Sequence, residues 1–262
     1  MPLLLLKLTL TPLLVGGATL AARRWGPAIG GWIVSLPLTS GPILFFLALD
    51  HGPAFAAEAT TGTLLGLGAI CGYCVGHLIA SRHGPVQALA AASAAFVLVA
   101  VAVQPITGAP FILLAALVVA SIAGVLRLLP DSAGARVTRE HPAWDLPARV
   151  VVGTALVVGL TAIAPYLGAV TSGLVATFPV YVSVLAVFEH LHAGRLAALG
   201  VLRGLLVGLF GTVAFYVVLH ALLVPAGIAV AFAAAVAVTL AIGALALRRV
   251  RASISEPEPE PV

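Results

Sequence analysis

The segment from Pro27 to Leu49, PAIGGWIVSLPLTSGPILFFLAL, carries no charge until Asp50 and is long enough to cross a bilayer as a helix. Its middle predicts a break in that helix. Pro37 and Pro42 lack a backbone N–H and crowd the preceding turn, and Thr39-Ser40-Gly41 between them has poor helix propensity. Unpaired backbone groups cannot face hydrocarbon, so the break must lie against protein or a water-filled cavity. We therefore predict a binding site near the middle of the membrane at this break.

The composition of the chain is that of a polytopic membrane protein. Of its 262 residues, 61% are hydrophobic and 8% are charged, and the mean hydropathy is +1.18. These values require many membrane spans and leave no room for a separate soluble domain. The formal charge of +4 does not indicate nucleic acid as a partner, because the basic residues lie between apolar segments and form no long run.

Apolar segments of span length predict an all-α protein with nine membrane helices. The predicted repeats are residues 1–104 and 148–247, each with four spans, joined by a connector helix and loop at 105–147 and followed by an acidic, Pro-rich, disordered tail at 248–262. The expected helices are 2–22, 27–49, 54–80, 85–103, 108–129, 148–166, 169–190, 194–222 and 226–247. Turn chemistry separates them at 50–53, 82–85, 104–105, 165–168 and 224–227.

The distribution of Lys and Arg predicts the orientation. Every second loop carries arginine, as in Arg82 and Arg195, and the loops between them carry none. Cytoplasmic loops are the ones enriched in these residues, so we expect the N-terminus outside and the C-terminus in the cytoplasm. Arg23-Arg24 follow the first apolar run and do not precede it, which indicates an uncleaved first span. Lys7 is the one basic residue expected near the outer face.

An internal repeat appears when the chain is shifted against itself by 142 positions. Pro37 then falls on Pro179 in mid-span, and the span boundaries coincide. Four spans return the chain to its starting side, and a single connector helix then crosses the membrane once more. The two four-span units are therefore inserted with opposite orientation, as in many secondary transporters. The matching pairs without gaps are Gly17/Gly159, Gly26/Gly168, Gly31/Gly173, Pro37/Pro179, Phe46/Phe188, Gly52/Gly194, Gly62/Gly204 and Gly66/Gly208.

One segment resembles a known family. Residues 167–222, with Gly173, the pair Phe178-Pro179 and the loop His192-Ala193-Gly194-Arg195, are similar to the core of the GlpM-like small bacterial membrane proteins. The first half resembles the same unit more distantly, so the chain looks like two fused units. It departs from the single unit in its length, its connector helix and its Ser40-Gly41-Pro42 break. The resemblance implies a bacterial inner-membrane location and a link to surface polysaccharide, and it carries over no catalytic residue.

Ionisable residues inside spans are the candidates for gating or ion pairing. Lys7 and Glu58 are expected in the outer part of their spans, where they either pair or extend separately to the interface. Glu189 and Arg203 are expected toward the inner side, facing each other. Asp50 and Glu189-His190 fall at comparable ends of the two repeats, which predicts either a pair of polar gates or ordinary polarity at loop edges.

Metal and enzyme chemistry find little support. Glu189, His190 and His192 do not share one helix face, and the two cysteines, Cys71 and Cys74, lie inside an apolar helix, so no metal or other cofactor is expected. Nucleotide-binding and hydrolase motifs are missing from the sequence. An enzyme acting on a lipid-linked substrate would need an acid/base pair at one depth, and Lys7 with Glu58 is the one candidate. Because the sequence offers no other catalytic residues, we predict that the protein is not an enzyme.

The break at residues 36–42 predicts the class of ligand. Gly41-Pro42 begins a new half-helix, and its partly positive end suits a carboxylate or phosphate, with Thr39 and Ser40 beside the exposed N–H groups. Pro179 lacks a preceding glycine, so the second repeat is expected to kink there, with Tyr181 and Ser183 as further contacts. The alternative is that Pro37 and Pro42 only kink a helix that its neighbours cover.

Two classes of function remain open from the sequence. The first is a non-ATP-driven transporter or lipid flippase for an anionic small molecule or lipid-linked substrate. The second is a non-catalytic membrane component of an envelope polysaccharide biosynthesis complex. The bilayer is the expected partner in both, and association into a homo-oligomer is also open.

Overall fold

The computed structural model describes residues 2–38, 40–130, 142, 144–163 and 177–255. These residues form helices joined by short turns, and no strand occurs among them. The elements are α1 (Pro2–Trp25), α2 (Pro27–Ser35), α3 (Ser40–His51), α4 (Pro53–Ala80), α5 (Pro85–Ala102), the 3-10 turn η1 (Gln104–Ile106), α6 (Phe111–Leu128), α7 (Asp145–Ile163), α9 (Val180–Ala193), α10 (Arg195–Ala226) and α11 (Ile228–Ser255).

Five of these helical stretches are long and apolar enough to cross a membrane. They are Pro27–His51, which includes the break, Pro53–Ala80, Pro85–Ile106, Phe111–Leu128 and Arg195–Ala226. Val180–Ala193 and Ile228–Gly243 are shorter apolar helices. The all-helical membrane class predicted from composition is therefore confirmed.

Glycine makes the sharp reversals between helices. Gly26, Gly52 and Gly84 have φ of 100°, 90° and 118°, a region in which a Cβ is strained. Each is followed by proline at the first helical position, where the missing N–H costs nothing. Gly194 and Gly227 make the two later reversals with φ of 88° and 80°. The predicted turns at 50–53, 82–85 and 224–227 are confirmed, and the turn at 165–168 lies outside the described residues.

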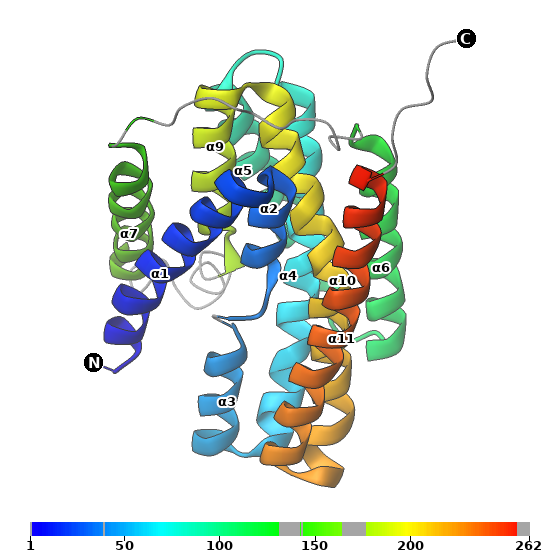
Figure 1. The fold of residues 1–262 in the computed structure, drawn as a ribbon. Coiled ribbons are helices and arrows are strands. Elements are labelled where there is room, and N and C mark those ends of the chain that lie inside the picture. The colour runs from blue at the N-terminus through cyan, green and yellow to red at the C-terminus, as the bar shows by residue number, and fades with distance from the viewer. Residues whose placement is uncertain (1, 39, 131–141, 143, 164–176, 256–262) are drawn as a thin grey trace.

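The helices alternate in direction, so their turns gather at two ends of the bundle (Figure 1). We call one of them the arginine end. It holds the end of α1, the α4–α5 turn, the start of α7 and the α9–α10 turn, and it carries Arg23, Arg82, Arg149 and Arg195. The opposite end holds the turns after α3 and α10.

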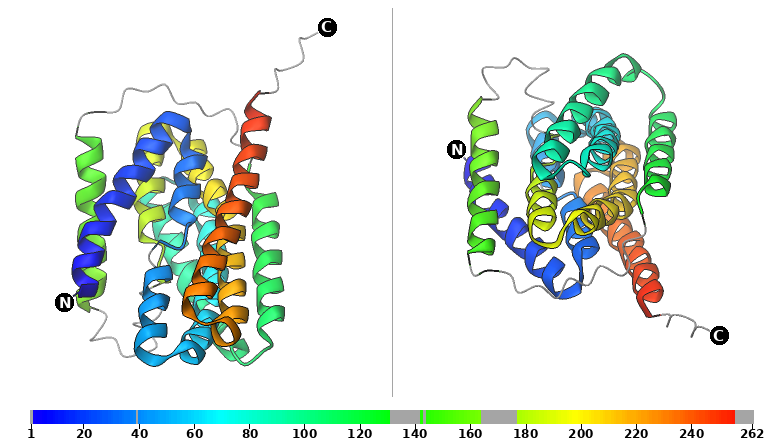
Figure 2. Two further views of the ribbon diagram at one scale, coloured as in Figure 1. Left: turned by 60° about the horizontal axis from the view of Figure 1, so that its bottom comes forward. Right: turned by 90° about the horizontal axis from the view of Figure 1, so that it is seen from above.

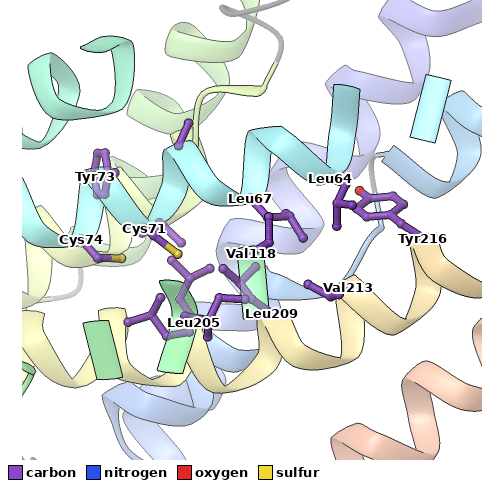
Figure 3. Packing of buried hydrophobic residues seen from close by; sticks show 14 of the residues in the cluster. Leu64, Leu67, Cys71, Tyr73, Cys74, Val118, Leu205, Leu209, Val213 and Tyr216 are labelled. Atoms are coloured by element: carbon purple, nitrogen blue, oxygen red, sulfur yellow. The ribbon is translucent and has the colours of Figure 1, made fainter. Parts of the chain in front are cut away.

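The core lies between α4 and α10. The views in Figure 2 place α4, α9 and α10 in the middle, with α5, α6, α7 and α11 around them. Figure 3 shows Leu64 and Leu67 of α4 facing Leu205 and Leu209 of α10, with Val118 of α6 closing the interface. Cys71 and Cys74 point into this packing and are not paired with each other. The expectation that they are small packing residues is confirmed.

Candidate functional site

The predicted break is present, and α10 covers it. α2 ends at Ser35 and α3 begins at Ser40. The hydroxyl of Thr212 donates to the carbonyl oxygen of Ser35 at 2.6 Å, and the N–H of Gly41 donates to the carbonyl oxygen of Pro37 at 2.9 Å. Backbone groups at the break are therefore hydrogen-bonded partly within the break and partly to α10, as an apolar environment requires.

Glycines let α2 approach α10 closely enough for this. A Cβ on Gly31 would collide with the carbonyl oxygen of Val201, and one on Gly204 would collide with that of Ala28. A Cβ on Gly208 would collide with the Ser35 hydroxyl. Backbone-to-backbone packing of this kind is how small residues join helices in membranes. It fixes the end of α2, and with it the break, against the middle of α10.

A second interruption lies before α9. Phe178 and Pro179 are not helical, and α9 begins at Val180. The hydroxyl of Ser183 donates to the carbonyl oxygen of Pro179 at 2.9 Å, which satisfies a backbone group at this break. The expected kink at Pro179 is thus confirmed as an interruption of the helix, while residues 164–176 before it lie outside the described part of the chain.

One cavity of about 380 Å³ connects the two breaks. Its wall includes Pro37 and Ser40 from the first break and Pro179 and Tyr181 from the second. This volume is in the range of small-molecule sites. The described lining residues carry no charge, and the polar ones all bear hydroxyls: Ser35, Ser40, Thr63, Thr177, Tyr181, Thr212 and Tyr216.

Hydrogen bonds hold several of these hydroxyls in place. The Tyr216 hydroxyl donates to that of Ser40 at 2.6 Å, and the hydroxyls of Tyr181 and Thr11 are 3.2 Å apart. Tyr216 and Thr212, both on α10, were missed by the sequence reasoning, which considered only the broken helices. Their signal was present: a Thr and a Tyr four residues apart, and so on one face, within the uncharged stretch 204–219 of the helix.

Of the other predicted ligand-binding residues, Gly41 and Pro42 lie in the first turn of α3 but are not among the described residues of the cavity wall. Ser183 is buried on α9 one turn beyond Pro179. Thr39 lies outside the described residues. The N-terminal donors of α3 are fewer than expected, because Pro42 has no N–H and Gly41 uses its own within the break.

The candidate gating residues fall into two different environments. Asp50 and Glu58 are exposed toward the opposite end of the bundle, whereas Glu189 is only 4% exposed near the arginine end. The side chain of Lys7 lies outside the described part of the chain, so its pairing with Glu58 stays a prediction.

Glu189 belongs to a buried ion network that sequence reasoning did not predict. Arg149 Nη1 donates to Glu189 Oε1 at 2.9 Å, and Arg149 Nε donates to Asp145 Oδ2 at 3.0 Å. Arg23 Nη2 donates to the same Asp145 oxygen at 2.6 Å, and His192 Nδ1 lies 3.3 Å from Asp145 Oδ1. Arg149 and Asp145 are fully buried. The network joins α1, α7 and α9 at the arginine end.

The expectation that Glu189 faces Arg203 was wrong. Glu189 lies near the end of α9, whereas Arg203 is eight residues, about 12 Å, into α10 and therefore deeper in the bundle. Arg203 Nη1 donates to the carbonyl oxygens of Leu126 and Leu129 at 3.3 and 3.1 Å. It thereby satisfies carbonyl groups that the C-terminal end of α6 leaves free.

The electrostatics of the network set the charge state of Asp145, which precedes the predicted span at 148–166. Burial acts to raise the pKa of its carboxyl, but the hydrogen bonds from Arg23 and Arg149 and the charges of Arg149 and His192 outweigh it. The pKa of Asp145 is therefore below its ordinary value of 3.8. The carboxylate stays ionised between the two guanidinium groups at neutral pH.

His77 on α4 and His190 on α9 form a second polar pair. Their ring centroids are 6.3 Å apart, and His77 is fully buried on α4. Both ring nitrogens of His77 and the Nδ1 of His190 lack a hydrogen-bond partner among the described residues. No group of three or more His, Cys, Asp or Glu side chains that could hold a metal ion occurs among the residues that the structure describes.

Comparison of the chain with family models, with curated proteins and with solved structures gave no match. The resemblance to GlpM-like proteins stays a prediction.

Proposed function

We propose that the chain is a non-ATP-driven transporter or lipid flippase that binds an anionic substrate in the cavity between its two helix breaks. The observation that carries this proposal is the cavity itself, because its wall combines Pro37 and Ser40 with Pro179 and Tyr181, from breaks 142 positions apart in the sequence. Discontinuous helices meeting at a midplane site are the arrangement used by many secondary transporters.

The contacts between helices support two inverted four-span repeats within a nine-span chain. α3 packs on α4 as α9 packs on α10, and α4 packs on α5 as α10 packs on α11. α3 also contacts α11 as α9 contacts α5. The turn glycines Gly52 and Gly194 have nearly equal φ, 90° and 88°, and α10 begins 195 − 53 = 142 positions after α4. Between the two units, α6 serves as the connector.

The positions of the arginines support an inner-membrane orientation with this end in the cytoplasm. Arg23, Arg82, Arg149 and Arg195 lie at one end of the bundle, together with the end of α11 (Figure 1). The turns after α3 and α10, at the opposite end, carry no Lys or Arg. By the positive-inside rule the N-terminus is then outside and the C-terminus is cytoplasmic.

Hydrogen-bond donors in the cavity wall support the proposal of an anionic substrate. They are mainly side-chain hydroxyls and not, as first expected, the N–H groups at the start of α3. The start of α3, whose dipole end is partly positive, reaches the cavity at Ser40. The Ser40 hydroxyl accepts from Tyr216 and keeps its own hydrogen, and in the pair of Tyr181 and Thr11 either hydroxyl can be the donor. The hydroxyls of Ser40 and Tyr181 can therefore donate to carboxylate or phosphate oxygens in the cavity. No carboxylate among the described lining residues opposes a negative charge.

A cavity-filling variant tests the site. Ala59 lines the cavity from α4, so Ala59→Phe should occupy part of its volume, while Ala94→Phe places the same side chain at an exposed position on α5. Purified wild type and both variants would be screened by thermal unfolding with inorganic phosphate, organic carboxylates, undecaprenyl phosphate, choline and glucose. We expect stabilisation by one of the anions in wild type and Ala94→Phe, and none in Ala59→Phe.

Proteoliposomes then separate transport from an accessory role. Wild-type protein should exchange the stabilising anion, or move the lipid phosphate between leaflets, without ATP. Binding without movement would favour the accessory membrane component. Equal stabilisation of wild type and Ala59→Phe would place the site elsewhere.

A further inference from the structure

A second recess, of about 640 Å³, lies at the arginine end between α4, α6 and α10. Its polar wall is basic, with Arg82, His83, Arg127 and Arg195, and no carboxylate is among the described residues that line it. The remaining wall consists of apolar residues from the ends of α4 and α6. The recess shares no described lining residue with the cavity at the helix breaks.

The arginines of this recess differ from those of the ion network at the same end. Arg23 and Arg149 are neutralised by Asp145 and Glu189. Arg82 and Arg127 are exposed residues, and neither has an ion-pair or hydrogen-bond partner within the part of the chain that the structure describes.

Arg195 is held in position but keeps free donors. Its Nε donates to the Ser81 hydroxyl at 2.7 Å, and its other N–H groups have no partner among the described residues. Guanidinium groups gathered with no carboxylate partner among the described residues favour a negatively charged ligand, above all one with the oxygen geometry of phosphate.

The apolar residues at the border of the recess indicate that the anion belongs to a molecule with an apolar part. Ile79 is 68% exposed and Leu128 is 61% exposed, and both line the recess beside the arginines. They lie in the last turns of two helices of membrane-spanning length. In a bilayer crossed by these two helices, the arginines would lie at the level of the headgroups and the exposed apolar side chains beside the acyl chains.

We propose that this recess binds an anionic phospholipid of the leaflet at the arginine end. Arg82, Arg127 and Arg195 contact the headgroup phosphate, and an acyl chain lies along Ile79 and Leu128. A free phosphate ion would use the arginines but not this apolar border, so the structure favours a lipid. The site is independent of the proposed function, since it holds whether or not the chain transports a substrate.

The test compares lipids and variants on the full chain purified in detergent. The probes are phosphatidylglycerol, phosphatidylcholine and inorganic phosphate, and retained lipid is measured by native mass spectrometry while the unfolding midpoint is measured separately. The variant is Arg82→Gln/Arg127→Gln. The matched control is Arg24→Gln, which removes an exposed arginine at the same end that stacks on Trp25 and is outside the recess.

We expect wild type and Arg24→Gln to retain phosphatidylglycerol in preference to phosphatidylcholine. The double variant should bind phosphatidylglycerol roughly fivefold more weakly for each arginine removed, from the usual strength of an arginine near an anionic membrane surface. The lipid-retention measurement is made at room temperature, so a lowered unfolding midpoint in the double variant would not obscure it.

Equal retention of the two lipids by wild type, or unchanged retention by the double variant, would overturn the proposal. If inorganic phosphate alone reproduced the whole stabilisation, the site would belong to a free anion and the lipid assignment would be wrong.

Discussion

At the scale of single residues, glycine controls how closely α2 and α10 approach. A Cβ at Gly204 would collide with the carbonyl oxygen, the carbonyl carbon and the Cα of Ala28, which are backbone atoms that cannot rotate away. We therefore expect Gly204→Ala to destabilise the protein by about 1–3 kcal/mol, the usual cost of overpacking. The measurement is the unfolding midpoint in detergent.

Gly124→Ala is the control for this change. Gly124 is exposed on α6 and has nothing within 4 Å of an added Cβ. The same substitution should there be neutral or stabilise by about 0.5–1 kcal/mol, since alanine favours the helix more than glycine does. If both variants lost the same stability, close packing would not be the reason for the glycine at position 204.

Single hydroxyl groups of the cavity wall can also be tested one at a time. Tyr216→Phe removes the donor to Ser40 Oγ at the start of α3 while keeping the ring and its edge-to-face contact with Phe215. The loss of one buried hydrogen bond should lower stability by about 1 kcal/mol. It should also weaken stabilisation by any anion that the screen identifies. An unchanged response to that anion would remove Tyr216 from the binding site.

At the scale of elements, the ion network fastens α1, α7 and α9 together. Asp145→Asn would leave Arg149 fully buried with one carboxylate partner instead of two. Removing one member of a buried pair costs about 3–5 kcal/mol, because the remaining charge is left uncompensated. Chemical or thermal unfolding in detergent measures the loss, and Asp50→Asn, at an exposed residue of the opposite end, should change little.

The same network gives a pH dependence with a definite sign. Because the pKa of Asp145 is lower in the folded protein than its ordinary 3.8, its stabilisation is fully present above that value. It is lost as the pH falls through the lowered folded-state pKa. The stability difference between wild type and Asp145→Asn should therefore be constant near neutral pH and shrink under strong acid. A difference that shrank already between pH 7 and pH 5 would point to another group.

The elements also show what sequence reasoning could and could not predict. The helix ends were predictable, because Gly-Pro pairs and Gly194 impose local conformations that few other residues allow. The break at Pro37 was predictable for the same local reason. The partners of Arg149 were not, since its contacts with Asp145 and Glu189 depend on how α7 and α9 are rotated about their axes.

Rotation could not be predicted for these helices because most are apolar on every side. A change of one residue turns a helical side chain by about 100°, and without a polar face no periodicity marks the side that faces a neighbour. Thr212 and Tyr216 do share one face of α10, but they were overlooked because only the broken helices were considered, although their positions decide which hydroxyls reach the break. The cavity joining Pro37 to Pro179 needed the three-dimensional packing of the two halves.

At the scale of the whole molecule, the two ends of the bundle predict which residues each side of the membrane can reach. Single cysteines would replace His51, His83 and Ala226 in a background with Cys71→Ala and Cys74→Ala. All three target positions are exposed, while both native cysteines are buried. The two alanines would remove background labelling at a modest cost in packing.

An impermeant thiol reagent should label the cysteines at positions 51 and 226 in intact cells, and the one at 83 only after permeabilisation. The reason is that His51 and Ala226 lie at the end whose turns carry no Lys or Arg, whereas His83 follows Arg82 at the arginine end. Labelling of 83 but not of 51 and 226 in intact cells would reverse the orientation. Labelling of 51 without 226 would contradict the common end itself, and with it the inverted arrangement that places both helix breaks at one cavity.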